Sequence, residues 1–171
     1  MFARWQPRWD RLRSMSFHLA QINIGRLHRS LDEHENTEFV GGLDHINAIA
    51  ESSAGFIWRL QDDDGLSSSY IRLPGEDDPL LIVNYSIWEG LDALRDFVYR
   101  SAHNSYLRRR HEWFEKPTEP TTVMWWVPAG TVPSLAAAYD RLKELSANGP
   151  TARAWSLSET FPPPGDGSLL P

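Results

Sequence analysis

The chain has 171 residues, of which 41% are hydrophobic and 23% charged, a composition typical of one globular domain with a core of its own. Its net charge of −6 argues against a nucleic-acid partner or an anionic membrane surface. The lack of cysteine excludes disulfides, thiolate metal sites and cysteine nucleophiles, and agrees with a cytoplasmic location. No apolar run approaches the ~18–20 residues of a membrane span.

The two ends of the chain differ from the rest in composition. Residues 1–14 hold four Arg, a Pro and two Trp without an apolar stretch, so we expect an N-terminal extension, with Met15 as an alternative start of translation. Residues 162–171 are rich in Pro and Gly and predict a flexible tail. A single domain is therefore expected over residues 15–161.

Between these ends, strand and helix patterns alternate. Residues 17–24 predict a strand, and residues 38–51 a helix, because Phe39, Leu43, Ile46 and Ala50 recur on one helical face. Further strands are expected at residues 55–61, 79–88, 121–127 and, at the end of the domain, 152–157, and further helices after residue 88 and at residues 133–146. The order β-α-β-β-α-β is that of the ferredoxin-like fold, and predicts an α+β protein whose antiparallel sheet carries helices on one face.

A sheet with helices on one face needs a cover for the other, because the third and fourth strands are apolar on both sides. We expect a second subunit to provide it, so the sequence predicts a homodimer with Trp125 or Trp126 in the interface. The alternative is a monomer whose C-terminal segment covers the open face.

The segment that follows residue 88 predicts a long helix with two different faces. Leu91, Leu94, Val98, Ala102 and Ser105 form an ordinary core stripe at helical spacing. A second stripe, roughly 100° around the helix at ~100° per residue, holds an Arg, a His and three aromatic residues: Trp88, Arg95, Tyr99, His103 and Tyr106. Such a face predicts contact with a cavity or a partner.

Eight tryptophans are many for a chain of this length. One interpretation is a core and a subunit interface rich in Trp. The other is an aromatic pocket for a flat, small hydrophobic ligand. Of the two, the composition favours the core and interface rich in Trp.

Several segments together resemble a known bacterial family. They are SFHLAQINIGRL from Ser16, GFIWRLQ from Gly55, NYSIWEGLDALRDFVYRSAH from Asn84, RRRHEWFEK from Arg108, WWVPAG from Trp125 and PTARAWSL from Pro150. The family is domain-of-unknown-function family thirty-two ninety-one, and the resemblance covers residues 16–161. It implies a branch of the dimeric α/β-barrel superfamily, which includes antibiotic-biosynthesis-type monooxygenases, haem-degrading monooxygenases and spheroidene-monooxygenase-like enzymes.

The same resemblance implies a site around His103. In haem-degrading members, a strand ending in a Ser/Trp pattern leads into a helix whose Ala-His pair supplies the haem ligand, and Ser86, Trp88 and His103 stand in that order here. On this basis His103 is the expected metal ligand and Asn23 the polar neighbour. Four aromatic residues would wall the cofactor: Trp58, Trp88, Tyr99 and Tyr106. The alternative is a structural His103, hydrogen-bonded within the helix–sheet junction or a dimer interface.

Two classes of function follow from these patterns. The first is a monooxygenase-like oxidoreductase that acts on a small hydrophobic molecule, either with haem or without a cofactor. In the cofactor-free version, His103 or Asn23 would be the catalytic group that assists proton transfer. The second class is a non-catalytic small-molecule-binding or dimerisation module, and no motif in the sequence separates the two.

Overall fold

The structure, a computed structural model, describes residues 16–65 and 67–165. The N-terminal extension predicted over residues 1–14 lies outside the described residues, and so do residues 166–171 of the predicted tail. The strands are β1 (Phe17–Arg26), β2 (Phe56–Arg59), β3 (Leu81–Trp88) and β4 (Thr122–Pro128). The helices are α1 (Thr37–Ser52), α2 (Leu91–Arg100), α3 (His103–Arg109) and α4 (Leu135–Asn148), with 3₁₀ turns at His34–Asn36, Ser68–Tyr70 and Arg110–Glu112.

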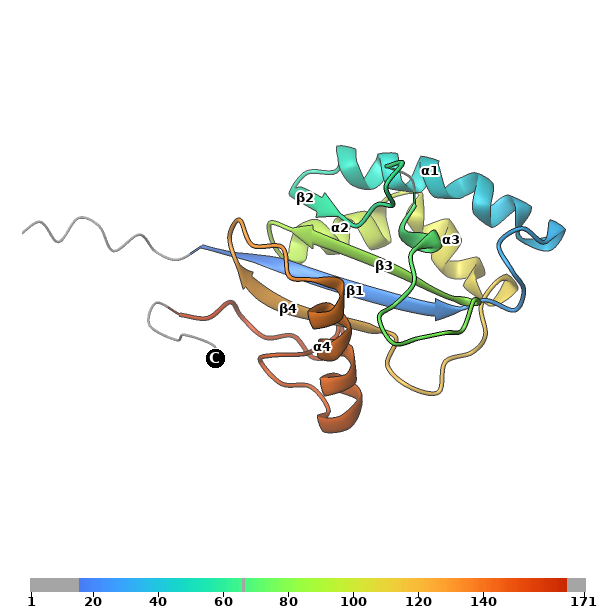
Figure 1. The fold of residues 1–171 in the computed structure, drawn as a ribbon. Coiled ribbons are helices and arrows are strands. Elements are labelled where there is room, and N and C mark those ends of the chain that lie inside the picture. The colour runs from blue at the N-terminus through green and yellow to red at the C-terminus, as the bar shows by residue number, and fades with distance from the viewer. Residues whose placement is uncertain (1–15, 66, 166–171) are drawn as a thin grey trace, which may run out of the picture.

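The four strands form one sheet in the order β2-β3-β1-β4, in which all neighbours are antiparallel (Figure 1). The predicted α+β class and the ferredoxin-like sheet are therefore confirmed. β3 and β1 are the central strands, whereas β4 lies at an edge. The strand predicted over residues 152–157 is reduced to one bridge, in which Trp155 and Met124 exchange backbone hydrogen bonds of 2.7 and 3.0 Å.

The two faces of the sheet carry different layers. The inner face, as we call it, packs against α1 and α2: Leu19, Trp88 and Met124 form a cluster with residues of these helices. A second cluster on the same face joins Leu27 and Ile82 to Phe39 of α1 and Trp113. The opposite, outer face presents Ala20, Ile22, Val83, Tyr85, Ile87, Val123 and Trp125.

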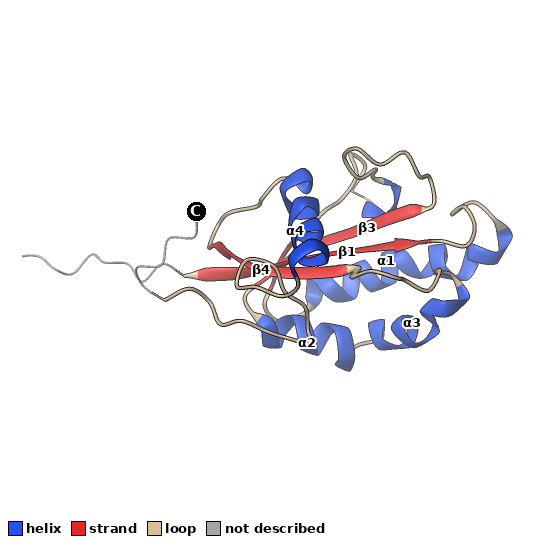
Figure 2. Cartoon of the chain, turned by 90° about the horizontal axis from the view of Figure 1, so that it is seen from below, coloured by secondary structure: helices blue, strands red, loops and turns tan. Residues whose placement is uncertain are grey.

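The outer face is covered by α4, which corrects the prediction of helices on one face only. Ala138, Leu142 and Leu145 of this helix are buried against that face, and Figures 1 and 2 show α4 on the opposite side of the sheet from α1. The spacing of these three residues is that of an amphipathic helix, whose apolar stripe needs a surface to cover. Trp125 is already buried within this one chain. The open face on which the homodimer prediction rested is thus filled. The homodimer stays a prediction, but this argument no longer supports it.

The predicted long helix is two helices, because Ser101 interrupts it. The Ser101 backbone is extended, and its hydroxyl accepts a hydrogen bond of 3.1 Å from the backbone nitrogen of His103. The same hydroxyl donates to the Phe97 carbonyl, so Ser101 links the end of α2 to the start of α3. The break shifts the helical phase, so Ala102 and Ser105 of the predicted core stripe are exposed, whereas Phe97 of α2 is buried.

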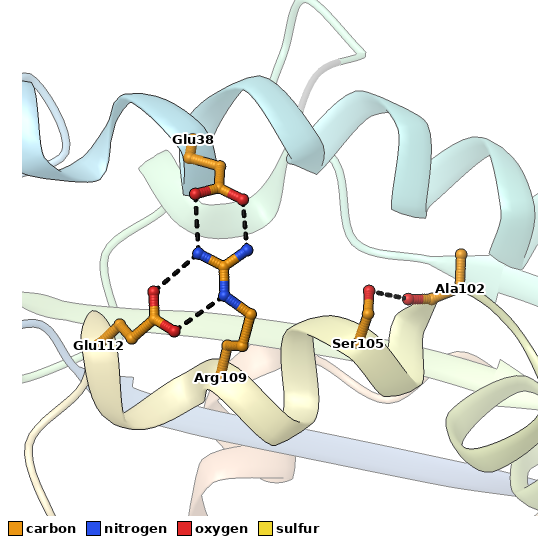
Figure 3. A network of polar contacts seen from close by, with 5 residues as sticks. All are labelled: Glu38, Ala102, Ser105, Arg109 and Glu112. Atoms are coloured by element: carbon orange, nitrogen blue, oxygen red, sulfur yellow. Dashed lines mark hydrogen bonds and ion pairs between the residues drawn. The ribbon is translucent and has the colours of Figure 1, made fainter.

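α1 and α3 contact each other at two places: a tyrosine of α3 lies over a glycine of α1, and an arginine of α3 forms an ion pair with α1. Tyr106 of α3 lies against Gly42 of α1, and its ring stacks on Trp113 at 5.8 Å between centroids. Nearby, the Arg109 guanidinium donates to the carboxylates of both Glu38 on α1 and Glu112 (Figure 3). Exposed ion pairs contribute only ~0–1 kcal/mol, so the ring contact is the stronger determinant of how closely these helices approach.

Two adjacent glycines of α1 allow a matched test of that contact. A Cβ at Gly42 would lie 2.6 Å from ring carbon Cε1 of Tyr106, whereas a Cβ at Gly41 meets nothing within 4 Å. We expect Gly41→Ala to leave the melting temperature unchanged or raise it, since alanine is favoured over glycine inside a helix by ~1 kcal/mol. Gly42→Ala should lower it by several degrees, because the Tyr106 ring must move off Trp113. Equal melting temperatures for the two variants would contradict the close approach.

Candidate functional site

A cleft of about 1630 Å³ lies between the inner face of the sheet and the helices α1, α2 and α3, and continues past residues 115–121 to α4. Ligand pockets usually measure ~300–1,000 Å³, so the space is ample for a small molecule. Asn84, in the middle of the central strand β3, lies in this cleft and is exposed. An exposed side chain at such a position shows that the helices do not pack on the centre of the sheet.

The floor of the cleft is polar because of the register between β1 and β3. Gln21 pairs with Ser86 and Asn23 with Asn84, and all four side chains line the cleft. The apolar pairs lie toward the two ends, where Leu19 faces Trp88 and Leu27 contacts Ile82. The helices are therefore held at both ends of the inner face and stand off its polar middle.

A relay of hydrogen bonds fixes the orientation of Gln21. The indole Nε1 of Trp88 donates to the Ser86 hydroxyl at 2.9 Å, and that hydroxyl donates to the Gln21 oxygen Oε1 at 3.1 Å. The indole nitrogen can only donate, and the Ser86 hydroxyl uses its one hydrogen on the Gln21 oxygen. The amide nitrogen of Gln21 is left to donate to another group, such as a ligand.

The two asparagines of the floor are used differently. Asn23 donates its amide nitrogen to the Thr122 hydroxyl at 2.6 Å and to the Thr121 carbonyl at 3.3 Å. Both amide hydrogens are thereby used, so Asn23 offers only its oxygen to the cleft. The Asn84 side chain makes no hydrogen bond with any other residue that the structure describes. On the helix side, the amide nitrogen of Asn47 lines the cleft and is buried, also without a partner among the described residues.

His103 is the titratable group of the cleft wall, at the first position of α3. Its Nδ1 lies 3.4 Å from the Val98 carbonyl oxygen, which can only accept, so Nδ1 carries the proton and Nε2 keeps its lone pair. Burial lowers the pKa of His103 below its usual 6.5, and the Val98 carbonyl offsets part of this effect. The imidazole is therefore neutral at pH 7 and able to accept a proton at Nε2.

Aromatic rings connect His103 to the floor. The imidazole lies 4.9 Å from the Phe97 ring, and Phe97 stacks on Trp88 at 5.1 Å and 25°. Trp88 lines the cleft but is only 1% exposed, so little of its ring is open to a ligand. Tyr106 also lines the cleft, whereas Tyr99 is 47% exposed and lies at its outer margin.

Trp58 does not join this group, contrary to its predicted role. A β-bulge between Phe56 and Trp58 places Trp58 opposite Ile87, on the outer face, where its ring meets Tyr85 at 5.1 Å. A bulge adds one residue to a strand and reverses which residues face inward. As a result Arg59 faces the cleft instead, 11% exposed and paired with Glu51 at 2.7 Å.

The structure thus brings together His103, Trp88, Tyr106 and Asn23 of the predicted site. It adds residues that were not predicted: Gln21, Asn47, Asn84, Ser86 and Phe97. A sequence signal existed for the floor, since polar residues recur at every second position in two strands otherwise rich in apolar residues. Among the described residues, no group of three or more His, Asp or Glu side chains is arranged to hold a metal ion.

The depressed pKa of His103 predicts a pH-dependent stability. The unfolded chain takes up the proton near pH 6.5 and the folded chain only at lower pH, so the free energy of unfolding should fall as pH drops below 6.5. In NMR titrations the His103 ring should show a midpoint below 6.5. His103→Gln should weaken the loss of stability between pH 7 and 5, whereas His45→Gln, at an exposed position of α1, should leave it as in the parent. A His103 midpoint above 6.5 would contradict the buried, neutral imidazole.

The described helices include none that has the length and apolarity needed to cross a membrane. Among curated proteins, none matches this sequence at a significant level.

Solved structures with a related fold include SnoaB, a cofactor-independent oxygenase from Streptomyces nogalater, at 14% identity and a TM-score of 0.43, over 67% of this chain and 95% of SnoaB. PA3566 from Pseudomonas aeruginosa is 15% identical with a TM-score of 0.44, over 68% of this chain and 98% of that one. A protein of unknown function from Nitrosomonas europaea, NE2512, is 9% identical with a TM-score of 0.45, over 70% and 98% of the two chains. A family model matches residues 18–168, nearly the whole described chain, and this protein therefore belongs to the family named domain of unknown function, DUF3291.

Proposed function

We propose that the cleft binds a small planar molecule and that His103 removes a proton from it, in a cofactor-free oxidation by dioxygen. The observation that carries this proposal is the neutral imidazole of His103 beside a polar floor that the helices leave uncovered. A core histidine without such a role would be surrounded by packed side chains. Here it contacts the aromatic wall and lines the same cleft as a row of amide groups.

The residues of the cleft suit this chemistry. Nε2 of His103 is the available base, and the Phe97 and Trp88 rings provide a flat apolar wall. Negative charge that develops on a substrate oxygen after deprotonation can be stabilised by amide donors, of which Gln21 and Asn47 each have one unused. Asn23 can accept a hydrogen bond from a substrate hydroxyl through its oxygen.

The reaction balances without a further reductant. Loss of a proton from an activated methylene gives a carbanion that transfers electrons to dioxygen. The methylene becomes a carbonyl, one oxygen atom enters the product and the second leaves as water. Both methylene hydrogens leave in that water: His103 takes the first proton and returns it to the peroxide formed with dioxygen, and the second is lost from carbon as the O–O bond breaks.

Haem is a second candidate occupant, favoured by the position of the Val98 carbonyl. A histidine that donates through Nδ1 to a carbonyl presents Nε2 in the tautomer that binds iron. The cleft volume and the aromatic wall fit a flat macrocycle, so His103 would be the residue that holds the iron. Bound haem would supply oxygen activation, and the chain would contribute Nε2 of His103 and the surrounding walls.

A non-catalytic small-molecule-binding module is the remaining alternative. It uses the same cleft and the same aromatic wall but needs no base. The proton acceptor at His103 is therefore the feature that separates the enzyme from the module.

The cofactor-free proposal is tested by oxygen uptake with a panel of hydroxyaromatic compounds that carry an activated methylene. We expect turnover by the parent and a loss of kcat of about 100-fold or more in His103→Gln, the usual contribution of a general base. His45→Gln is the matched control and should keep the parental kcat. Turnover by His103→Gln at the parental rate would show that His103 has no part in the mechanism. Binding without turnover across the whole panel would favour the non-catalytic binding module.

Titration with haemin separates the two occupants. If His103 binds haem, the parent should give a Soret band that His103→Ala lacks, while His45→Ala keeps it. The melting temperature of His103→Ala should stay within a few degrees of the parent, since His103 contributes one weak hydrogen bond. An unchanged haemin spectrum in the parent would eliminate the haem version and leave the cofactor-free version standing.

A further inference from the structure

We propose that the ligand of this cleft carries an anionic group, held at the end of the cleft formed by α3 and the segment after it. The inference rests on the proposed function in that it takes the cleft to be a binding site for a small aromatic molecule. It adds the charge of that molecule, which the site chemistry around His103 does not determine.

The first observation is an uneven pairing of charges. The chain has 23 Asp and Glu against 17 Lys and Arg, and four of those Arg lie in the first 15 residues, outside the described part. Acidic partners are thus in clear excess, and most described cations use them: Arg26, Arg29, Arg59, Arg100, Arg109, Arg141, Lys143 and Arg153 all form ion pairs. Five described cations form none with any described residue: Arg72, Arg95, Arg108, Arg110 and Lys116.

The second observation is where these unpaired cations lie. Three of the five, Arg108, Arg110 and Lys116, line the cleft and are exposed, whereas Arg72 and Arg95 do not line it. Like charges that share one end of a cavity repel one another, so their presence there costs stability unless an anion joins them. The carboxylates that line the same cleft are already engaged, since Glu115 pairs with Arg26 and Glu119 accepts from the Ser146 hydroxyl.

The third observation is the distance from this end of the cleft to His103. Residues 103 and 110 are seven residues apart along helical backbone, about 10 Å at 1.5 Å per residue. A molecule of two or three fused rings covers that length. Its rings would lie beside Phe97 and His103 while a carboxylate, sulfonate or phosphate on its far end meets the cations. A group of unpaired cations in an otherwise acidic protein also speeds the arrival of such an anion.

The inference predicts a difference between two probes with the same ring system. Anilinonaphthalene sulfonate is anionic, and phenylnaphthylamine is the same molecule without the sulfonate. The parent should bind the sulfonate more tightly at low salt, and this preference should shrink as salt rises, because the Debye length falls from about 10 Å at 0.1 M to about 3 Å at 1 M. Binding of the neutral probe should not depend on salt.

Charge variants locate the anion. The double variant Arg108→Gln with Arg110→Gln should weaken sulfonate binding by roughly 3- to 10-fold, from the size of screened charge interactions at a few ångströms, and leave the neutral probe unaffected. The matched control is Arg29→Gln with Arg100→Gln, which removes the same charge from exposed residues that do not line the cleft. This control should bind both probes as the parent does.

The outcomes separate this inference from the proposed function. Equal effects of the two double variants on the sulfonate would overturn the anionic subsite even if both probes bind. A slower-sedimenting species in the Arg108/Arg110 variant, with an unchanged preference between probes, would assign these arginines to a subunit contact and also overturn it. Weaker sulfonate binding by the Arg108/Arg110 variant, together with full turnover by His103→Gln, would support the anionic subsite and refute the role of His103.

Discussion

The cleft depends on one constraint, the polar centre of the inner sheet face. Amide and hydroxyl groups of Gln21, Asn23, Asn84 and Ser86 occupy the middle of two central strands. Apolar helix side chains placed over them would leave unpaired polar groups at a cost of ~1–3 kcal/mol each. Apolar clusters at the two ends, one around Trp88 and one around Leu27, hold the helices instead. The space between these clusters is a result of the register, and the site residues line it.

The break at Ser101 has a comparable effect on His103. In an unbroken helix, His103 would share a stripe with Tyr99, which is 47% exposed. Because α2 ends at the extended Ser101 and α3 begins after it, the imidazole sits beside Phe97 with its Nδ1 toward the Val98 carbonyl. After the same break, Tyr106 lies against Gly42 and Trp113. The break at Ser101 therefore affects both the base of the site and the packing of α3 on α1.

Much of the fold follows from apolar periodicity, since each strand and helix of the ferredoxin-like core lies close to where the sequence predicts it. The errors have local causes that periodicity does not contain. The bulge in β2 puts Arg59 instead of Trp58 on the inner face, and the composition of a four-residue strand does not reveal a bulge. The position of α4 depends on which face lacks a cover, a property of the assembled sheet. The sequence was enough to propose His103 and Asn23 as site residues. Which of their atoms donate is known only from their partners in the structure, Val98 and Thr122.

The unpaired amides give a physical reason to regard the cleft as a site rather than as loose packing. Loose packing leaves apolar voids, which cost stability in proportion to their volume and have no preference for polar linings. Here the lining includes the buried amide nitrogen of Asn47 and the unused donor of Gln21. A ligand oxygen bonded to them would recover free energy that the empty protein forgoes. The unpaired amides lower the stability of the ligand-free protein, and the same amides strengthen binding when a ligand pairs with them. This is the behaviour expected of a preorganised site.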